Sequence, residues 1–356
     1  MNKKRKILVC PLDWGLGHAS RDIHIIRALI ENDFEVFVAG SPKILKYLGN
    51  EIPDVKCVDL EGFKVKYSKR KSQIFKMLTL IPRIFFWTIK EHFKLKQLVK
   101  KHNFNIVISD NRFGLWNKNV KSIFITHQLR VIFPSGLRIF EFIYRLLVRF
   151  IINKYDECWI PDLKEEKNLA GDLSHPKRKL KNGKYIGLLS RFAIFNHYQA
   201  PETLFDIVFV LSGPEPQRSL LEEIIYFQIQ ESNLRIAIVR GTYENSVLDY
   251  SIPKFDLLQT NELNKLIDQS EIVVCRSGYS SVMDLISKNK KAILIPTPGQ
   301  TEQEYLATYL TEKDYFTSYT QDKFKLSRIV VSKIKQPNFR EKNNENLLQK
   351  AIKELE

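Results

Sequence analysis

The sequence of 356 residues has few cysteines, and no pair of them has the spacing of a metal knuckle or a redox motif. Cys10, Cys57, Cys158 and Cys275 lie far apart, so we expect reduced thiols in a cytosolic protein. No uninterrupted run of about 18 apolar residues occurs, so no segment is expected to span a membrane. The basic N-terminus reaches Asp13 after a short apolar run, which predicts a first β-strand rather than a signal peptide. The sequence also lacks any Asp-x-Asp pair.

Acidic residues are scarce in the first half of the chain. Residues 1–187 contain 36 Lys and Arg against 18 Asp and Glu, whereas residues 188–356 contain 20 against 22. The first half therefore has a net charge of +18 and the second of −2, which together give the formal net charge of +16. Such a basic region suits contact with nucleic acid or with anionic lipid, or it serves general solubility.

Two basic stretches of the first half are also rich in large apolar residues. Residues 64–101 contain 12 Lys and Arg and one acid, Glu91, and Pro134–Phe150 carries three arginines among aliphatic and aromatic residues. Helices with cations on one side and apolar residues on the other are typical of a membrane interface. The alternative is a pair of core helices with a solvated basic face. Because Pro82 interrupts the first stretch, we predict two helices there.

Short runs rich in Val, Ile and Phe alternate with helical patterns along the chain, which predicts an α/β protein with doubly wound parallel sheets. The predicted strands are Lys6–Pro11, Glu35–Ala39, Lys56–Leu60, Asn105–Asp110, Ser122–Thr126, Glu157–Pro161, Asp206–Ser212, Leu234–Arg240, Glu271–Cys275 and Lys291–Pro296. The pattern restarts near residue 204, so we place a boundary between residues 187 and 200. We predict one Rossmann-like domain over residues 1–190, a second over 191–340, and a C-terminal helix in 341–356.

Polar residues of the first half gather at the carboxyl ends of predicted strands, where open α/β sheets bind ligands. The first strand runs into a turn with Gly15, Gly17 and His18, and such a turn lets the backbone approach an anion. His18 could deprotonate a hydroxyl nucleophile, or it could simply cap the helix or be exposed. Asp110 and His127 follow two further strands, and we predict that they face the same crevice as acceptor-side groups or alternative bases.

The stronger signal follows two consecutive strands of the second half. A turn over residues 276–281 supplies a glycine, serine hydroxyls and backbone N–H groups suited to a phosphate. Asp284, in the helix that follows, can accept hydrogen bonds from a ribose diol. The next strand ends in the loop Pro296–Tyr305, whose amide and carboxylate side chains suit sugar hydroxyls. Two such loops at consecutive strand ends indicate a ligand site.

The segment from Cys275 to Ala307 resembles the donor-binding region of family 28 glycosyltransferases, which include the enzyme that forms lipid II and monogalactosyldiacylglycerol synthases. The shared pattern is Arg-Ser-Gly, small residues and an acid, followed by a proline and a loop rich in Gln and Glu. The resemblance implies the GT-B fold, with two Rossmann-like domains facing each other across a cleft. It implies transfer of a hexose or N-acetylhexosamine from a UDP-linked donor. A lipid-linked or glycolipid acceptor is inferred from the basic charge and the amphipathic stretches alone.

Carried over by position, the resemblance implies that Gly278, Tyr279 and Ser280 lie against the diphosphate. Asp284, which replaces a family Glu, would hold the ribose. Gln303 and Glu304 would hold the donor sugar; Glu304 replaces a family Gln, which leaves the sugar open. The other residues assigned to the donor are Arg191, Ser212, Gly213, Arg218, Thr260, Arg276, Ser277, Gln300 and Thr301.

Several of these assignments rest on separate matches to the family or on a departure from it. Arg191 matches an interdomain arginine near the diphosphate, and Thr260 falls loosely where the family backbone reads the uracil edge. Residues 212–218 depart from the family glycine loop because two prolines remove N–H donors, which leaves Arg218 to supply charge. In the first half, His18 matches the family's glycine-loop histidine, and His127 matches a histidine of the acceptor cleft.

The missing Asp-x-Asp pair predicts a transferase that needs no metal and no cofactor, because helix N-termini, amides and arginines stabilise the leaving diphosphate. We expect direct displacement with inversion, with His18 as the first candidate base and Asp110 as the second. We expect a cytoplasmic protein held peripherally on the inner face of the membrane. Gly17–Arg21 also resembles nucleotide-sugar hydrolases of nonulosonic acid synthesis, which is one alternative. The other is nucleic-acid binding, against which the acid-balanced second half argues.

Overall fold

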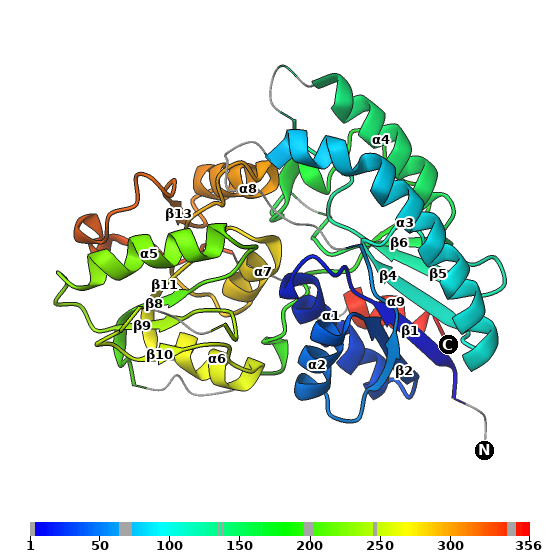
Figure 1. The fold of residues 1–356 in the computed structure, drawn as a ribbon, viewed down its shortest axis with the longest axis horizontal. Coiled ribbons are helices and arrows are strands. Elements are labelled where there is room, and N and C mark those ends of the chain that lie inside the picture. The colour runs from blue at the N-terminus through cyan, green and yellow to red at the C-terminus, as the bar shows by residue number, and fades with distance from the viewer. Residues whose placement is uncertain are drawn as a thin grey trace. The chain divides into compact units, whose positions relative to one another are not determined.

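The computed structural model describes residues 4–63, 73–133, 136, 138–164, 166–195, 202–244, 248–339 and 347–356, apart from the side chains of residues 73–78, 138 and 139. The chain forms two compact units (Figure 1). The first comprises Met1–Val65, Met77–Arg191 and Glu341–Glu356, and the second comprises Lys66–Lys76 and Phe192–Arg340. The second unit's main segment thus begins inside the interval where the sequence suggested a boundary. The C-terminal segment, predicted as a separate helix, is part of the first unit.

The first unit is built on a parallel sheet of seven strands in the order β3-β2-β1-β4-β5-β6-β7. The strands are β1 (Lys6–Cys10), β2 (Glu35–Gly40), β3 (Lys56–Asp59), β4 (Ile106–Asp110), β5 (Lys121–Ile125), β6 (Glu157–Ile160) and β7 (Gly183–Tyr185). The helices are α1 (Leu16–Glu31), α2 (Pro42–Glu51), α3 (Gln73–His102), α4 (Arg138–Ile152) and α9 (Leu347–Lys353), with a 3-10 turn at Gly171–Leu173. A further 3-10 turn, Ala193–Phe195, belongs to the second unit. The strand order reverses between β1 and β4, so a ligand crevice is expected at their carboxyl ends.

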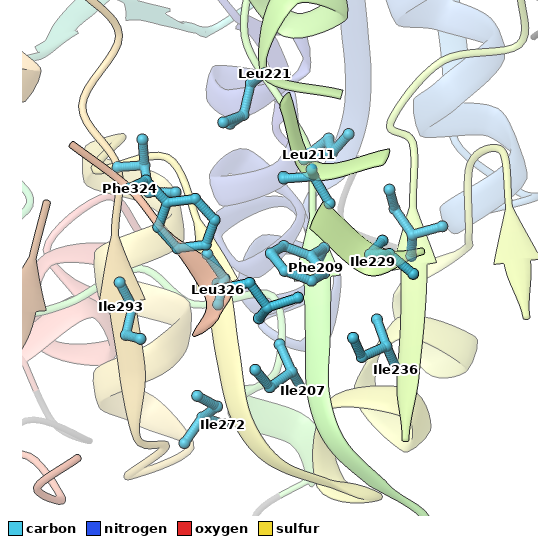
Figure 2. Packing of buried hydrophobic residues seen from close by; sticks show 14 of the residues in the cluster. Ile207, Phe209, Leu211, Leu221, Ile229, Ile236, Ile272, Ile293, Phe324 and Leu326 are labelled. Carbon is cyan, nitrogen blue, oxygen red and sulfur yellow. The ribbon is translucent and has the colours of Figure 1, made fainter. Parts of the chain in front are cut away.

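The second unit repeats this plan with a six-stranded parallel sheet in the order β10-β9-β8-β11-β12-β13. The strands are β8 (Phe205–Val210), β9 (Ile236–Val239), β10 (Lys254–Phe255), β11 (Ser270–Cys275), β12 (Ala292–Leu294) and β13 (Thr317–Ser318). The helices are α5 (Gln217–Ile229), α6 (Thr260–Asp268), α7 (Tyr279–Ser287) and α8 (Thr301–Glu312), with 3-10 turns at Leu326–Arg328 and Val331–Lys333. Figure 2 shows the core of this unit, where Phe209, Ile272 and Phe324 pack together. Its strand order reverses between β8 and β11.

Two predictions about secondary structure were wrong. The short edge strands β7, β10 and β13 were missed, because two or three residues carry no recognisable period. The break at Pro82 does not occur, since α3 runs through it. A proline removes only one backbone hydrogen bond from the helix interior, and Leu95 and Val99 anchor the later turns of α3 in the core.

Large apolar side chains on α3 and α4 are exposed. They form what we call the exposed apolar face: Ile81, Phe85, Phe86, Ile89, Phe93, Phe142, Ile143, Leu146, Leu147 and Phe150. Each of these residues is 41% to 69% exposed, although both helices also have residues in the core. The solvated side of these helices is therefore apolar as well as basic. In the described part of the chain, no helix is both long enough and apolar enough to cross a membrane.

Candidate active site

Four polar side chains meet at the point of the first sheet where the strand order reverses. His18 and Arg21 lie one turn apart on α1, and Asp110 is the last residue of β4. His18 Nδ1 lies 2.9 Å from Asp110 Oδ2, and Arg21 Nε donates to the same oxygen at 2.9 Å. Arg21 Nη2 also donates to Asp110 Oδ1, and Arg21 Nη1 lies 3.1 Å from His127 Nδ1. His18, Asp110 and His127, which the sequence predicted to share a crevice, thus lie in one network through Arg21.

Asp110 is fully buried and ionised. Burial alone would raise the pKa of Asp110, but the Arg21 guanidinium and His18 outweigh burial and hold that pKa well below its usual range. The second-base role predicted for Asp110 does not fit these contacts, because the arginine fork stabilises the carboxylate and weakens it as a proton acceptor. The contacts suit a different role, in which Asp110 orients the imidazole of His18.

The contacts also bear on which nitrogen of each histidine carries the proton. Arginine only donates, so His127 Nδ1 accepts from Arg21 and its Nε2 is protonated. His18 Nδ1 lies within hydrogen-bond distance of an acceptor, Asp110 Oδ2, and of a donor, Arg21 Nη2. In the tautomer in which Nδ1–H donates to the ionised carboxylate, His18 Nε2 keeps a lone pair. Arg21 Nη2 is also 3.0 Å from His18 Nδ1, but in this tautomer that contact is not a hydrogen bond. The His18 side chain is 21% exposed, whereas His127 is buried, so His18 is the accessible base.

Arg21 and its neighbour Asp22 were not predicted as site residues from the sequence. Arg21 could have been found from the spacing of Gly17–Arg21, because residues three apart share a helix face. Asp22 is fully buried, and neither of its carboxyl oxygens has a hydrogen-bond partner. Burial, and then the charge of Asp110, raise the pKa of Asp22 well above its usual value. Burial and the neighbouring carboxylate therefore both disfavour ionisation of Asp22, which lies behind the charged network.

In the second unit, the turn after β11 leads directly into α7. Gly278 is the N-cap of α7 with φ −70° and ψ 138°, so the N–H groups of the first helical turn are presented at the strand end. A Cβ atom built on Gly278 would meet nothing within 4 Å, so the turn is open rather than packed shut. Ser280 is partly exposed, while Tyr279 and Asp284 are buried. The turn has the free space and the donors that an anion needs.

Arg276 and Ser277 hold loops together. Arg276 Nη1 donates to Ile295 O at 3.3 Å and Pro296 O at 3.2 Å, and Nη2 donates to Gln217 O at 2.6 Å. Burial lowers the pKa of Arg276 to about 10. Ser277 Oγ donates to Gln303 O at 2.8 Å. The contacts of Arg276 therefore position the loops after β8 and β12, rather than reaching toward the donor as we predicted.

The loop before α8, which begins at Thr301, is organised by its own side chains. Gln303 Oε1 accepts from Thr297 N at 2.9 Å, and Gln303 Nε2 donates to Gln300 Oε1 at 2.6 Å. Glu304 Oε1 accepts from Gly299 N at 2.8 Å. The side chains predicted to hold the sugar are thus already oriented by the loop.

The loop after β8 contradicts the predicted role of one residue, Arg218. Gly213 has φ +103°, a conformation that favours glycine, and Ser212 precedes it. Arg218 is buried, and its guanidinium donates to Glu215 Oε1 and to Glu222 Oε2, at 2.5 and 2.6 Å. The predicted supply of charge to a phosphate does not fit Arg218, because two carboxylates already neutralise it.

The two remaining candidates sit at element boundaries. Arg191 is the last residue of the main segment of the first unit, where its Nη1 donates to Tyr47 Oη at 3.2 Å. Thr260 is buried and is the first residue of α6, between the capping-box residues Gln259 and Glu262. Within the described ranges, no three His, Cys, Asp or Glu side chains cluster as a metal site would require. Metal independence stays a prediction.

Comparisons with known proteins agree with this architecture. Residues 207–355 match the glycosyltransferase family 28 C-terminal domain. A curated relative from Haemophilus influenzae (strain PittEE) is the UDP-N-acetylglucosamine--N-acetylmuramyl-(pentapeptide) pyrophosphoryl-undecaprenol N-acetylglucosamine transferase. It is 24% identical over 233 residues, a match that covers 55% of this chain and 61% of the relative. The match thus spans less than two thirds of that protein.

Similar solved structures cover nearly the whole chain. MurG of Acinetobacter baumannii has a TM-score of 0.53 at 11% identity, covering 99% of both chains. The glycosyltransferase SnogD from Streptomyces nogalater has a TM-score of 0.61 at 11% identity, covering 99% of this chain and 94% of that one. The spinosyn rhamnosyltransferase SpnG complexed with thymidine diphosphate has a TM-score of 0.57 at 13% identity, covering 88% and 86%. These likenesses confirm the predicted GT-B type of fold.

Proposed function

We propose that this chain, a family 28-like protein with the GT-B fold, is a glycosyltransferase that moves a sugar from a nucleotide diphosphate to a lipid-linked or glycolipid acceptor. The observation that carries the proposal is the pair formed by His18 and Asp110 where the strand order of the first sheet reverses. An accessible imidazole held by a buried carboxylate is a general base for a hydroxyl nucleophile.

In the proposed reaction, His18 Nε2 takes the proton of the acceptor hydroxyl. The hydroxyl oxygen forms a bond to the anomeric carbon while the bond from that carbon to the diphosphate oxygen breaks, and the diphosphate leaves with the electron pair. A single displacement of this kind inverts the configuration at the anomeric carbon of the sugar. Asp110 stabilises the imidazolium that His18 becomes, at a contact of 2.9 Å. A positioned base of this type contributes roughly 10²- to 10⁴-fold in rate.

The open turn at Gly278 is the proposed seat of the donor diphosphate. The N–H groups at the start of α7 stabilise negative charge as it develops on the leaving group, without a metal. Asp284 would hold the ribose, and Gln303 and Glu304 would hold the sugar. The curated relative is named for UDP-N-acetylglucosamine, which supports a UDP-linked donor for this chain.

The exposed apolar face supports a lipid acceptor. Exposed cations accompany it on α3: Arg83, Lys90, Lys94, Lys96, Lys100 and Lys101. Glu91, the helix's one acid, is buried and paired with Arg112 at 2.9 Å, so it does not offset these cations at the surface. Apolar side chains beside unopposed cations suit an anionic membrane surface. We propose that the protein works peripherally on the inner face of the cytoplasmic membrane.

A thermal-shift screen with UDP, GDP, dTDP, CMP and their sugars tests the donor half of the proposal. A ligand that binds the folded state raises the melting temperature according to its concentration over its Kd. We expect UDP or a UDP-sugar to stabilise the protein, and Asp284→Ala to remove the shift. No shift with any nucleotide would contradict the proposal. If a bound nucleotide-sugar released only free sugar, the hydrolase alternative would be favoured instead.

A further inference from the structure

A threonine hydroxyl at the carboxyl edge of the second sheet has no hydrogen-bond partner. Thr297 lies in the loop after β12 and is 1% exposed, and its Oγ1 makes no hydrogen bond. A hydroxyl that is buried without a partner is unfavourable, and such groups are rare in folded proteins. Packing alone does not account for this hydroxyl, because a valine side chain would fill nearly the same space without that cost.

The loops after three adjacent strands come together near Thr297. In the second sheet β11 lies between β8 and β12. Arg276, directly after β11, donates to Pro296 O at 3.2 Å and to Gln217 O at 2.6 Å, so it connects the loop of Thr297 with the start of α5. Arg276 Nε is also buried without a partner. Two unpartnered polar groups thus lie on neighbouring loops at the edge where open α/β sheets bind ligands.

The loop after β8 leaves space on the side that faces Thr297. Gly213 has φ +103°, which favours glycine. Apart from the chain neighbours of Gly213, a Cβ atom built there would meet one atom within 4 Å, Thr297 Oγ1 at 3.8 Å. Since glycine has no side chain, a ligand oxygen between the two loops could accept a hydrogen bond from the hydroxyl.

Thr297 is also joined to the side chain that is proposed to hold the sugar. Thr297 N donates to Gln303 Oε1 at 2.9 Å. Ser277, which precedes Gly278, donates to Gln303 O at 2.8 Å. Gln303 is therefore held by Thr297 on one side and by the turn proposed for the diphosphate on the other.

We propose that the hydroxyl of Thr297 donates a hydrogen bond to the phosphate that carries the sugar in the nucleotide diphosphate donor. This assignment rests on the proposed function and deepens it, because it adds a residue that distinguishes a nucleoside diphosphate from a monophosphate. A hydrogen bond to a charged oxygen is stronger than one to a neutral oxygen, so the hydroxyl adds affinity for the diphosphate. The same contact stabilises the negative charge of the leaving group.

The test compares the affinities for UDP and UMP in the wild-type protein, Thr297→Val and Thr297→Ser by isothermal titration. If the thermal-shift screen selects another base, the corresponding diphosphate and monophosphate are the probes. We expect Thr297→Val to weaken UDP at least about tenfold and UMP less than about twofold. Thr297→Ser keeps the hydroxyl and should bind UDP within about threefold of wild type. Equal losses of UDP and UMP in Thr297→Val, or unchanged UDP affinity, would overturn the assignment.

Thermal unfolding without nucleotide gives a second readout. Because the hydroxyl has no partner in the free protein, Thr297→Val should melt at or above the wild-type temperature. Thr297→Ser should melt below it, because the lost methyl group leaves a small cavity. The two variants should therefore differ in opposite directions in stability and in UDP affinity. A lower melting temperature in Thr297→Val would contradict the assignment, since it would indicate a structural hydrogen bond.

Thr311→Val is the matched control, because Thr311 is a hydroxyl residue of α8 that has partners. Its Oγ1 donates to Ala307 O at 2.7 Å and lies 2.9 Å from Ser318 Oγ. Thr311→Val should leave the affinities for UDP and UMP unchanged. A loss of UDP affinity equal to that in Thr297→Val would overturn the assignment, because the effect would not be specific to Thr297.

Failure of this assignment is distinct from failure of the proposed function. If the wild-type protein binds UDP and Thr297→Val binds it equally well, only the role of Thr297 is wrong and the donor site stands. If the wild-type protein binds no nucleoside diphosphate, the proposed function is wrong and the assignment to Thr297 is wrong with it.

Discussion

Replacing Gly278 with alanine separates its proposed ligand role from any role in folding. The backbone at Gly278 has φ −70°, which alanine adopts readily, and the added Cβ meets nothing within 4 Å. Gly278 is also the N-cap of α7, where alanine is less favourable than glycine. That loss and the gain from a stiffer unfolded chain are each about 1 kcal/mol or less and oppose each other. The free energy of unfolding should therefore change by less than about 1 kcal/mol.

The same methyl group would occupy the space proposed for the diphosphate. We expect nucleotide affinity to fall at least about tenfold, or 1.4 kcal/mol, because the phosphate can no longer approach the N–H groups of α7. Isothermal titration with the nucleotide found by the thermal-shift screen measures this change, and thermal unfolding without nucleotide measures the fold. The control is Gly49→Ala on α2, where an added Cβ also meets nothing within 4 Å. Wild-type affinity in Gly278→Ala would refute the proposed diphosphate site.

Three further predictions concern an acid, the cysteines and a buried ion pair. Because the pKa of Asp22 is raised in the folded state, the wild-type free energy of unfolding should fall as pH rises above about 3.9, by up to about 1.4 kcal/mol per pH unit, until pH passes the raised pKa. Asp22→Asn should lose that slope in urea unfolding between pH 4 and 7, and equal slopes would contradict the assignment. Cys57, which is exposed, should react first with a thiol reagent in native buffer, and the three buried cysteines only after unfolding; mass spectrometry of the labelled peptides decides this. Arg218→Ala should destabilise the second unit by about 1–3 kcal/mol in calorimetry, because Glu222 loses one partner but keeps Arg240, and an unchanged transition would restore Arg218 as a ligand candidate.

The sequence predicted best those features that are set by residues close together in the chain. The ten predicted strands were found because buried parallel strands read as apolar runs bounded by polar residues. The turn at Gly278 was identified from a strand, a glycine and a helix start in succession, and the structure shows it open. These features depend on residues that are adjacent in the chain, so they can be predicted from one sequence without knowledge of the tertiary structure.

Features that depend on distant residues were missed or misassigned. Asp110 was named as a base because nothing in its own segment shows that Arg21, 89 residues away, neutralises it. Arg218 was assigned to phosphate because its pairing with Glu222 depends on how α5 packs. The C-terminal helix α9 gave no sign of its partner, and the structure places it against α1, where Gln349 accepts from Asn32 at 2.9 Å.

The central claim is that His18 activates an acceptor hydroxyl for attack on a nucleotide-linked sugar. The direct measurement is transfer of radiolabelled sugar from the donor identified by the screen into the organic phase of a membrane lipid extract. We expect label in the lipid fraction with the wild-type protein, and roughly 10²- to 10⁴-fold slower transfer with His18→Gln at unchanged nucleotide affinity. Equal transfer rates for the two proteins, or label recovered only as free sugar in water, would contradict the account.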